Sequence, residues 1–508
     1  MLYRSTRGGE AGVPFEKALL SAYASDGGLY VPESMPHLET DQLRGWAKKT
    51  TAEVCAEVMA RFTDLQLDEL EAITTSAFAS FNNGVEPPLP LQKVGEAYHL
   101  DTGLGPTLAF KDIGQQVVAR LLSKYLAQRG EHANIIVETS GDTGPAAIAG
   151  VAGLPGCDIF VLYPQGRVSA VQELQMLTWG HAPNVHVFRT EGDTDEQAEA
   201  LKTLFADQAF MRTHRVVSIN SINWARVMVQ SAYYFWAYLQ LRPEVDGEVH
   251  FIVPTGAFGN AAGGLVAKMM GLPIGKIVCA TNANDVVHRT ISTGDMAIAG
   301  NVPTVSPAMD IQFAYNVERM LFLVSDGDAA TTAKYMRAAQ ERKSAVLPAW
   351  LLERVQRTFL SCAVSDAQTC DTMAAVHREA GVILDPHSAV GVWAARAKHV
   401  RAALQQGMGG NVAQAPVCVV LTAHPAKFDE ACRKAGVPVA TCEKVERLKV
   451  LPHAFEWLRA PPNRADKLQV WAMAIKKAVE AEARRRDAAK QGRGAEPPKP
   501  SASLRARL

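Results

Sequence analysis

Residues 250–271, HFIVPTGAFGNAAGGLVAKMMG, decide the kind of fold that this chain can adopt. The β-branched run His250–Val253 leads into the glycine-rich loop Thr255–Asn260, and the apolar segment Ala261–Gly271 follows. The first segment predicts a strand and the last a helix. A strand, a glycine-rich loop and a helix in this order are typical of a parallel sheet in an α/β protein.

The same order of elements recurs on both sides of this stretch. Asn134–Val137 precedes the loop Ser140–Gly144 and the helix Pro145–Val151, and Val417–Leu421 precedes the loop Thr422–Lys427. Further strands are predicted at Asp158–Leu162, Val185–Phe188, Val216–Ile219 and Ile277–Thr281. Because ligands collect at the carboxyl ends of parallel strands, these loops are the expected functional region.

The two ends of the chain have a different pattern. Apolar residues recur at helical spacing within Thr51–Phe81, so residues 1–90 are predicted to be mostly helical. Glycine and proline in 82–90 indicate a boundary, and Asp466–Arg486 predicts a helix that ends in a basic run. We therefore expect a helical N-terminal domain at 1–90, a core of two α/β subdomains at 91–445, a helical segment at 446–486 and a flexible basic tail at 487–508.

The composition excludes several classes of protein. The 508 residues include 52 basic and 52 acidic ones, and this balance gives no reason to expect a nucleic-acid or membrane partner. No apolar run reaches the about 18 residues of a membrane span, and the polar segment Met1–Gly12 does not look like a secretory signal. The eight cysteines form no C-x-x-C pair and the histidines no metal-binding pattern, so we expect no metal site and a cytoplasmic protein. The terminal Ala506-Arg507-Leu508 resembles a peroxisomal address, which makes a peroxisome-type compartment the alternative.

Lys111 is the candidate catalytic residue. It lies in PTLAFKD, residues 106–112, ahead of a helix predicted from about Ile113 to Gln128 with Asp112 as its N-cap. A lysine flanked by apolar residues near a helix start would have a lowered pKa, which suits Schiff-base chemistry. An isolated lysine more often extends to solvent, so the surrounding loops decide between the two interpretations.

The loop Gly256–Asn260 suits an anion, because glycine lets the backbone approach closely and the N–H groups at a helix start bind phosphate. Tight packing between strand and helix is an equally good explanation of this loop taken alone. The chain has neither a Walker A loop nor a G-x-G-x-x-G motif after a strand. A single Asp142-Thr143-Gly144 triplet does not supply the two carboxylates of an aspartic protease.

Nine segments together give a more specific signal. They are Ala24–Pro32 (ASDGGLYVP), Gly105–Asp112 (GPTLAFKD), Thr139–Gly144 (TSGDTG), Asn220–Arg226 (NSINWAR), Val253–Asn260 (VPTGAFGN), Thr281–Arg289 (TNANDVVHR), Ser306–Gln312 (SPAMDIQ), Asp385–Gly391 (DPHSAVG) and Leu421–Phe428 (LTAHPAKF). In this order they resemble the threonine synthase family, pyridoxal-phosphate enzymes of the tryptophan-synthase-β fold type. The resemblance covers roughly residues 1–445 and leaves the end of the chain uncovered. It implies fold type II, with two three-layer αβα subdomains and a helical N-terminal extension.

The resemblance also implies roles for particular residues. Lys111 is similar to the lysine that forms the Schiff base with pyridoxal 5'-phosphate, and Thr422 to the hydroxyl partner of the pyridine nitrogen. The cofactor phosphate is expected on Gly256, Ala257, Phe258, Gly259 and Asn260. The substrate carboxylate and the cofactor ring are expected near Ser140, Asp142 and Thr143, and the substrate phosphate near Asn220, Arg226, His424 and Lys427.

The implied reaction converts O-phospho-L-homoserine and water to L-threonine and phosphate by γ-elimination and β-addition, in a monomer or homodimer. Two departures concern the reaction more than the cofactor: Leu104 replaces the usual histidine before Gly105, and Ala257 replaces the usual asparagine of the phosphate loop. A phospho-lyase that forms 2-oxobutanoate, ammonia and phosphate is therefore the first alternative. A protein that binds the cofactor without catalysis, with the basic tail as a docking arm, is the second.

Overall fold

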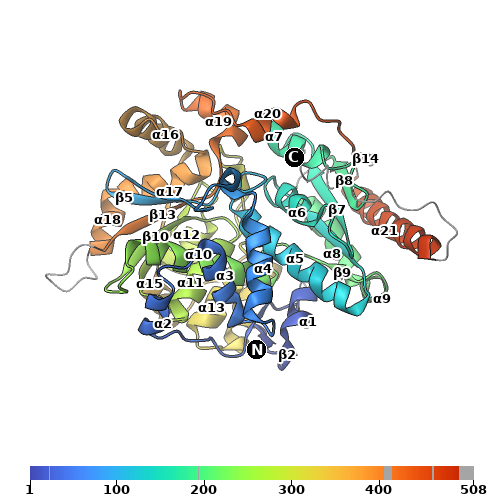
Figure 1. Ribbon diagram of the computed structural model, residues 1–508, viewed down its shortest axis with the longest axis horizontal. Coiled ribbons are helices and arrows are strands. Elements are labelled where there is room, and N and C mark those ends of the chain that lie inside the picture. The colour runs from blue at the N-terminus through green and yellow to red at the C-terminus, as the bar shows by residue number, and fades with distance from the viewer. Residues whose placement is uncertain (22, 193, 406–414, 460–462, 491–508) are drawn as a thin grey trace. The chain divides into compact units, whose positions relative to one another are not determined.

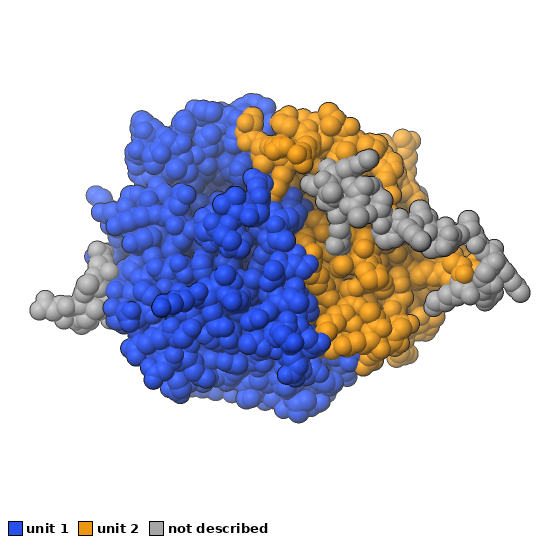
Figure 2. Space-filling model, in the orientation of Figure 1, with its two compact units in different colours: residues 1–114, 221–440 blue, residues 115–220, 441–508 orange. Residues whose placement is uncertain are grey.

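The computed structural model describes residues 1–21, 23–192, 194–405, 415–459 and 463–490 (Figure 1). The chain forms two compact units, neither of which is continuous in sequence (Figure 2). Unit 1 comprises Met1–Gly114 and Ser221–Ala440, and unit 2 comprises Gln115–Asn220 and Thr441–Leu508. Helix α5, Lys111–Arg129, begins in unit 1 and continues into unit 2.

Unit 1 is built on a six-stranded sheet with the strand order β12-β11-β10-β13-β5-β4. The strands are β4 Leu91–Val94, β5 Ala97–Asp101, β10 Val249–Pro254, β11 Ile274–Thr281, β12 Phe359–Ala363 and β13 Val417–Leu421. All neighbours are parallel except β4, which pairs antiparallel with β5. Strand β10, in the middle of the sheet, is buried along its whole length, as expected where helices cover both faces of a parallel sheet.

Two layers of helices cover this sheet. On one face Ile252, Val278 and Val419 form a core with residues of α16 and α17, and on the other Phe251 contacts Tyr234 of α10. The bounds of the helices after residue 220 are α10 Trp224–Leu241, α11 Gly259–Met269, α12 Val286–Thr293, η2 Pro307–Met309, α13 Val317–Val324, α14 Ala329–Arg342, α15 Ala349–Thr358, α16 Asp366–Ala380, α17 Pro386–Arg396, α18 Lys398–Gln405, η3 Pro425–Lys427 and α19 Asp429–Lys434.

The N-terminal part of unit 1 is less helical than its apolar spacing predicts. It contains a small antiparallel sheet of β1 Leu2–Ser5, β2 Val13–Pro14 and β3 Tyr30–Pro32, besides the helices α1 Phe15–Leu20, α2 Thr40–Gly45, α3 Thr51–Ala60, α4 Leu67–Phe78 and η1 Phe81–Gly84. Strands of two to four residues are too short to show a period of two, which explains why the sequence did not predict them. The segment 51–81 forms the two helices α3 and α4, and a capping box of Gln66 with Glu69 starts the second.

Unit 2 has a five-stranded, wholly parallel sheet with the order β14-β8-β7-β6-β9. Its elements are β6 Ala133–Glu138, α6 Thr143–Val151, β7 Cys157–Pro164, α7 Ala170–Leu177, β8 Val185–Thr190, α8 Thr194–Ala206, α9 Gln208–Thr213, β9 Val216–Val217, α20 Glu443–Leu448, β14 Glu456–Leu458 and α21 Arg464–Lys490. Trp471 of α21 is buried in the core of this unit and donates a hydrogen bond to Leu458 O at 3.2 Å.

The C-terminal helix is longer than predicted. α21 lies against α8 (Figure 1) and continues to Lys490, so residues 487–490, expected in the flexible tail, are helical. The ion pair of Lys467 with Glu196 of α8, at 2.7 Å, helps to attach the two helices to each other. The rest of the predicted tail, with Ala506-Arg507-Leu508, lies outside the described residues.

Candidate active site

In unit 1, Lys111 and Thr422 are brought together by backbone hydrogen bonds. Phe110 N donates to Thr422 O at 2.8 Å, His424 N donates to Leu108 O at 3.1 Å, and Ala109 pairs antiparallel with Ala423. The segment before Lys111 is thus attached to the loop that follows β13. Close approach requires glycine at position 103, where a Cβ atom would lie 2.7 Å from the carbonyl carbon of Ala423.

Asp112 holds the turn that precedes α5. We predicted it as the N-cap, but the helix begins at Lys111, and the buried Asp112 carboxylate accepts hydrogen bonds from Thr107 N at 2.8 Å and Thr107 Oγ1 at 2.6 Å. Burial raises the pKa of Asp112, while the hydrogen bonds from Thr107 and the charge of Lys427 act in the opposite direction. A Cβ atom at Gly105 would lie only 2.4 Å from Asp112 Oδ2, so this turn also requires a glycine.

Two buried cations lie in the same part of unit 1. Lys427 Nζ donates a hydrogen bond to Thr107 O at 2.9 Å, and a Cβ atom at Gly114 would lie 2.5 Å from Arg226 Nε. Burial lowers the pKa of Arg226 to about 10, although Tyr233 and the carboxylate of Asp112 oppose this change. His424 accepts a hydrogen bond from Ala426 N through Nδ1, at 3.2 Å. The expected substrate-phosphate residues Arg226, His424 and Lys427 therefore all lie in or near the two segments that carry Lys111 and Thr422.

The loop between β10 and α11 has the properties of an anion cradle. The N–H groups of Gly256, Ala257 and Phe258 donate no hydrogen bond to any described residue, and the first turn of α11 adds further unpaired N–H groups. Phe258 has φ of 64°, a left-handed conformation that is rare for a residue with a side chain. Asn260 accepts hydrogen bonds from Tyr233 and Tyr234 through Oδ1, while its buried Nδ2 has no partner among the described residues.

Thr422 has a polar atom that the described residues leave unpaired. Its backbone N donates to Ser388 Oγ at 2.9 Å, and its Oγ1 is buried without a hydrogen-bond partner among them. A buried hydroxyl is costly unless it finds a partner. An aromatic nitrogen at this position would meet that need, and an anion at Gly256–Asn260 would meet the need of the loop, so the residues of unit 1 fit a phosphorylated pyridine.

The remaining expected residues belong to unit 2, in the loop after β6 and at the end of the segment after β9. Gln172 Nε2 donates to Asp142 Oδ1 at 2.8 Å, which fixes the loop of Ser140 and Thr143. Asn220 Nδ2 donates to Glu138 Oε1 at 3.1 Å. Burial raises the pKa of Glu138 to about 7, a value that suits proton transfer near neutral pH. We did not single out Glu138 from the sequence, although a glutamate directly before the TSGDTG loop was a visible signal.

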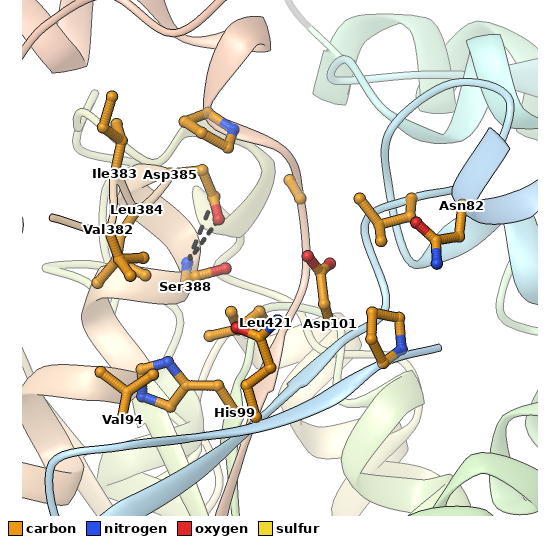
Figure 3. Close-up of a pocket in the computed structure, with 15 residues that line it drawn as sticks. Asn82, Val94, His99, Asp101, Val382, Ile383, Leu384, Asp385, Ser388 and Leu421 are labelled. Carbon is orange, nitrogen blue, oxygen red and sulfur yellow. Dashed lines mark hydrogen bonds between the residues drawn. The ribbon is translucent and has the colours of Figure 1, made fainter. Parts of the chain in front are cut away.

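Unit 1 also has a pocket of about 310 Å³ beside the loop after β13 (Figure 3). It is lined by Asn82, Pro90, Gln92, Val94, His99, Asp101, Leu104, Val382, Ile383, Leu384, Asp385, Ser388, Leu421, Ala423 and Pro425. Burial, together with the charge of Asp385, raises the pKa of Asp101 to about 6. The sequence did not predict this carboxylate pair, because Asp101 and Asp385 come from distant segments.

Comparison with known proteins identifies the family. Residues 2–78 match the family described as threonine synthase N terminus, residues 87–423 match pyridoxal-phosphate dependent enzyme, and residues 388–479 match threonine synthase, C-terminal. The chain belongs to the threonine synthase family. The third match ends at residue 479, so the likeness extends well beyond residue 445, where we expected it to end.

Individual members of the threonine synthase family match most of the chain. It is 39% identical to threonine synthase of Pseudomonas aeruginosa over 471 residues, 91% of this chain and 97% of that protein. It is also 39% identical to threonine synthase-like 2 of Rattus norvegicus over 493 residues, 95% of this chain and 97% of that protein. The crystal structure of pyridoxal-phosphate-bound threonine synthase from Brucella melitensis matches with a TM-score of 0.85 and 37% identity, over 94% of this chain and 99% of that chain.

These matches confirm several expectations from the sequence. The protein has the α/β fold type II architecture, pyridoxal 5'-phosphate is its cofactor, and it is a lyase of a family that acts on a small-molecule substrate. In the described part of the chain, no helical stretch has both the length and the apolar character of a membrane span. Compartment, oligomeric state, domain boundaries and the roles of individual residues stay predictions.

Proposed function

We propose that the protein is a threonine synthase, which converts O-phospho-L-homoserine and water to L-threonine and phosphate. The observation that carries the proposal is the pairing of the Lys111 and Thr422 segments, in a chain 39% identical to a bacterial threonine synthase. One of the paired segments carries an amine, and the other carries a hydroxyl with no partner among the described residues.

In this proposal the residues of unit 1 hold the cofactor at three points. Lys111 Nζ would bond its aldehyde carbon, the N–H groups of Gly256–Asn260 would bind its phosphate, and Thr422 Oγ1 would pair with its ring nitrogen. A neutral hydroxyl leaves that nitrogen less protonated than a carboxylate would. Since Ala257 has no side-chain donor, we assign the side-chain contact of the loop to the unpaired Nδ2 of Asn260.

Substrate binding and proton transfer fall to other groups of the chain. Ser140, Asp142 and Thr143 bind the carboxylate side, and Asn220, Arg226, His424 and Lys427 are the candidates for the phosphate, a dianion that requires Arg or Lys. The bound cofactor supplies an electron-withdrawing ring. Once the substrate amine has displaced it from the cofactor, Lys111 Nζ would take the proton from Cα of the substrate and then one from Cβ, and phosphate would leave from Cγ. A proton would then be returned to Cγ, water would add at Cβ, and a proton would be returned to Cα before Lys111 releases threonine.

The second candidate function is a phospho-lyase that forms 2-oxobutanoate, ammonia and phosphate from the same substrate. The equal similarity to threonine synthase-like 2 of Rattus norvegicus supports it, as do Leu104 and Ala257 in place of the usual residues. The two functions differ in whether water adds at Cβ before the product is released.

Product analysis separates these proposals. The purified holoenzyme is incubated with O-phospho-L-homoserine, and released phosphate, threonine and 2-oxobutanoate are quantified by NMR. Threonine in a one-to-one ratio with phosphate supports the synthase, and 2-oxobutanoate in that ratio supports the phospho-lyase. Lys111→Ala should abolish phosphate release, whereas Lys93→Ala, on the exposed side of β4, should leave it unchanged. A cofactor-loaded wild-type protein that releases no phosphate would instead be the non-catalytic binding protein.

A further inference from the structure

The segment at the start of α17, Asp385-Pro386-His387-Ser388, has no role in the function proposed so far. Asp385, His387 and Ser388 are all buried. The Asp385 carboxylate caps the helix by accepting hydrogen bonds from His387 N at 2.9 Å and Ser388 N at 3.3 Å, as the dashed lines to Ser388 show in Figure 3. Capping explains the aspartate and the proline after it, but it leaves the side chains of His387 and Ser388 unexplained.

His387 connects this helix start with η2, the short helix that lies against the phosphate cradle. Its Nε2 accepts a hydrogen bond from Ala308 N at 3.1 Å, and its Nδ1 lies 3.0 Å from Asp385 Oδ1. Because a backbone N–H only donates and a carboxylate accepts, a neutral ring with its proton on Nδ1 satisfies both partners. Ala308 and Met309 lie directly against Gly256, where a Cβ atom would be 3.1 Å from Met309 Cα and 3.3 Å from Ala308 O.

Ser388 connects the same helix start with the other end of the cofactor site. Its Oγ accepts a hydrogen bond from Thr422 N at 2.9 Å. Thr422 is the residue whose buried Oγ1 has no partner among the described residues. The position of that hydroxyl depends on the Thr422 backbone, and Ser388 holds this backbone from one side while Phe110 N holds it from the other.

We propose that His387 and Ser388 are positioning residues that fix the two ends of the pyridoxal-phosphate site from one helix start. His387 acts on the phosphate end through Ala308, and Ser388 acts on the ring-nitrogen end through Thr422. The proposal rests on the cofactor contacts assigned above to Gly256–Asn260 and Thr422. It requires the two side chains to affect different parts of the bound cofactor.

The test uses the full-length protein and three cofactor readouts that do not need turnover. These are the dissociation constant of pyridoxal 5'-phosphate from titration of the apoprotein, the ³¹P chemical shift of the bound phosphate, and the absorption spectrum of the bound ring. His387→Phe keeps a ring against Phe428, whose centroid is 4.7 Å away, but removes the acceptor for Ala308 N. It should raise the dissociation constant by about tenfold or more and shift the ³¹P signal, since the part-buried N–H of Ala308 loses its partner. His387→Gln, which keeps a hydrogen-bond acceptor, should have a dissociation constant and a ³¹P shift close to those of the wild type.

Ser388→Ala should change the absorption spectrum and leave the ³¹P shift at its wild-type value, whereas Ser388→Thr, which keeps the hydroxyl, should resemble the wild type. His250→Phe is the matched control for His387→Phe. His250 is 4% exposed against 3% for His387, and its Nδ1 also accepts a backbone hydrogen bond, from Lys276 N at 2.9 Å. It lies at the start of β10, at the opposite end of the strand from the cradle, so its replacement should leave the three cofactor readouts unchanged.

The Tm of both variants is measured alongside, so that a general loss of stability can be told apart from an effect on the cofactor site. The proposal is overturned if His387→Phe and His250→Phe have the same dissociation constant and ³¹P shift. It is also overturned if Ser388→Ala has the wild-type spectrum. If His387→Phe does not fold, the comparison of Ser388→Ala with Ser388→Thr tests the proposal, because Ser388→Ala removes only the Oγ atom. These readouts report cofactor binding, so they are separate from the product analysis, and failure of one proposal is distinguishable from failure of the other.

Discussion

Replacement of Gly105 by alanine tests whether the Asp112 turn positions Lys111. The new Cβ would lie 2.4 Å from Asp112 Oδ2 and 2.5 Å from Asp112 Cβ, about 1 Å short of ordinary van der Waals contact. The carboxylate is buried and must move away, which breaks its hydrogen bonds to Thr107 N and Thr107 Oγ1. Each bond to a charged group contributes about 1.5–3 kcal/mol, so the apoprotein should lose about 3–6 kcal/mol of stability.

For a chain of 508 residues this loss corresponds to a drop in Tm of about 3–6 °C. Since Lys111 adjoins Asp112, kcat should fall by about 10- to 100-fold, the effect expected of a displacement near 1 Å at a reacting group. Differential scanning calorimetry of the apoprotein measures the first effect, and phosphate release from O-phospho-L-homoserine measures the second.

Gly300→Ala is the matched control, because a Cβ atom at Gly300 would meet no atom within 4 Å. Its Tm and kcat should equal those of the wild type. If Gly105→Ala had the same Tm and kcat as Gly300→Ala, the Asp112 turn would not hold Lys111 in the way we argue.

Three further predictions concern other parts of the chain. Thr422→Ala should lower kcat by about tenfold and change the absorption spectrum of the bound cofactor, because the ring nitrogen loses its hydroxyl partner. Thr422→Ser, which keeps the hydroxyl, should have the wild-type kcat and spectrum. Equal spectra for the two variants would contradict the pairing of Thr422 Oγ1 with the ring nitrogen. Glu138→Gln should have a higher Tm than the wild type, and the difference should grow as pH rises from about 5 to 8. The reason is that burial raises the pKa of Glu138 to about 7, so the wild type loses stability as this carboxyl ionises in the folded state. A Tm difference that does not depend on pH would argue against this. Trp471→Ala should destabilise unit 2 by about 3–5 kcal/mol, measured by urea unfolding. Met473→Ala is the control, because this side chain on the same helix is 56% exposed, and it should cost less than about 0.5 kcal/mol. Equal losses would show that Trp471 does not attach α21 to the core of unit 2.

The sequence predicted the elements of the two large sheets more reliably than those at the ends of the chain. The predicted strand Val417–Leu421 coincides with β13, and His250–Val253 lies within β10. Strands that are buried on both faces appear as uninterrupted apolar runs, which makes them easy to find. The short strands β1 to β3 show no such run, and the sequence did not predict them.

The candidate site was predicted only as separate segments. The position of Lys111 in its motif was evident from the sequence, but the function of Asp112 was not, because a helix cap and a carboxylate that holds the preceding turn have the same local pattern. Glu138 and Asp101 were missed for a related reason. A carboxyl group acquires a raised pKa from burial, which depends on neighbours that are distant in sequence.

The sequence by itself determined the family and the cofactor and predicted the lysine, because the order of nine motifs and the alternation of strands and helices are properties of the linear chain. Only the tertiary structure decided which of these motifs meet. Lys427 reaches Thr107 across 320 residues, and His387 reaches Ala308 across 79, so neither contact follows from local propensity. The physical reason is that parallel strands separate their carboxyl-end loops by whole helices in sequence, and the sheet then places those loops side by side.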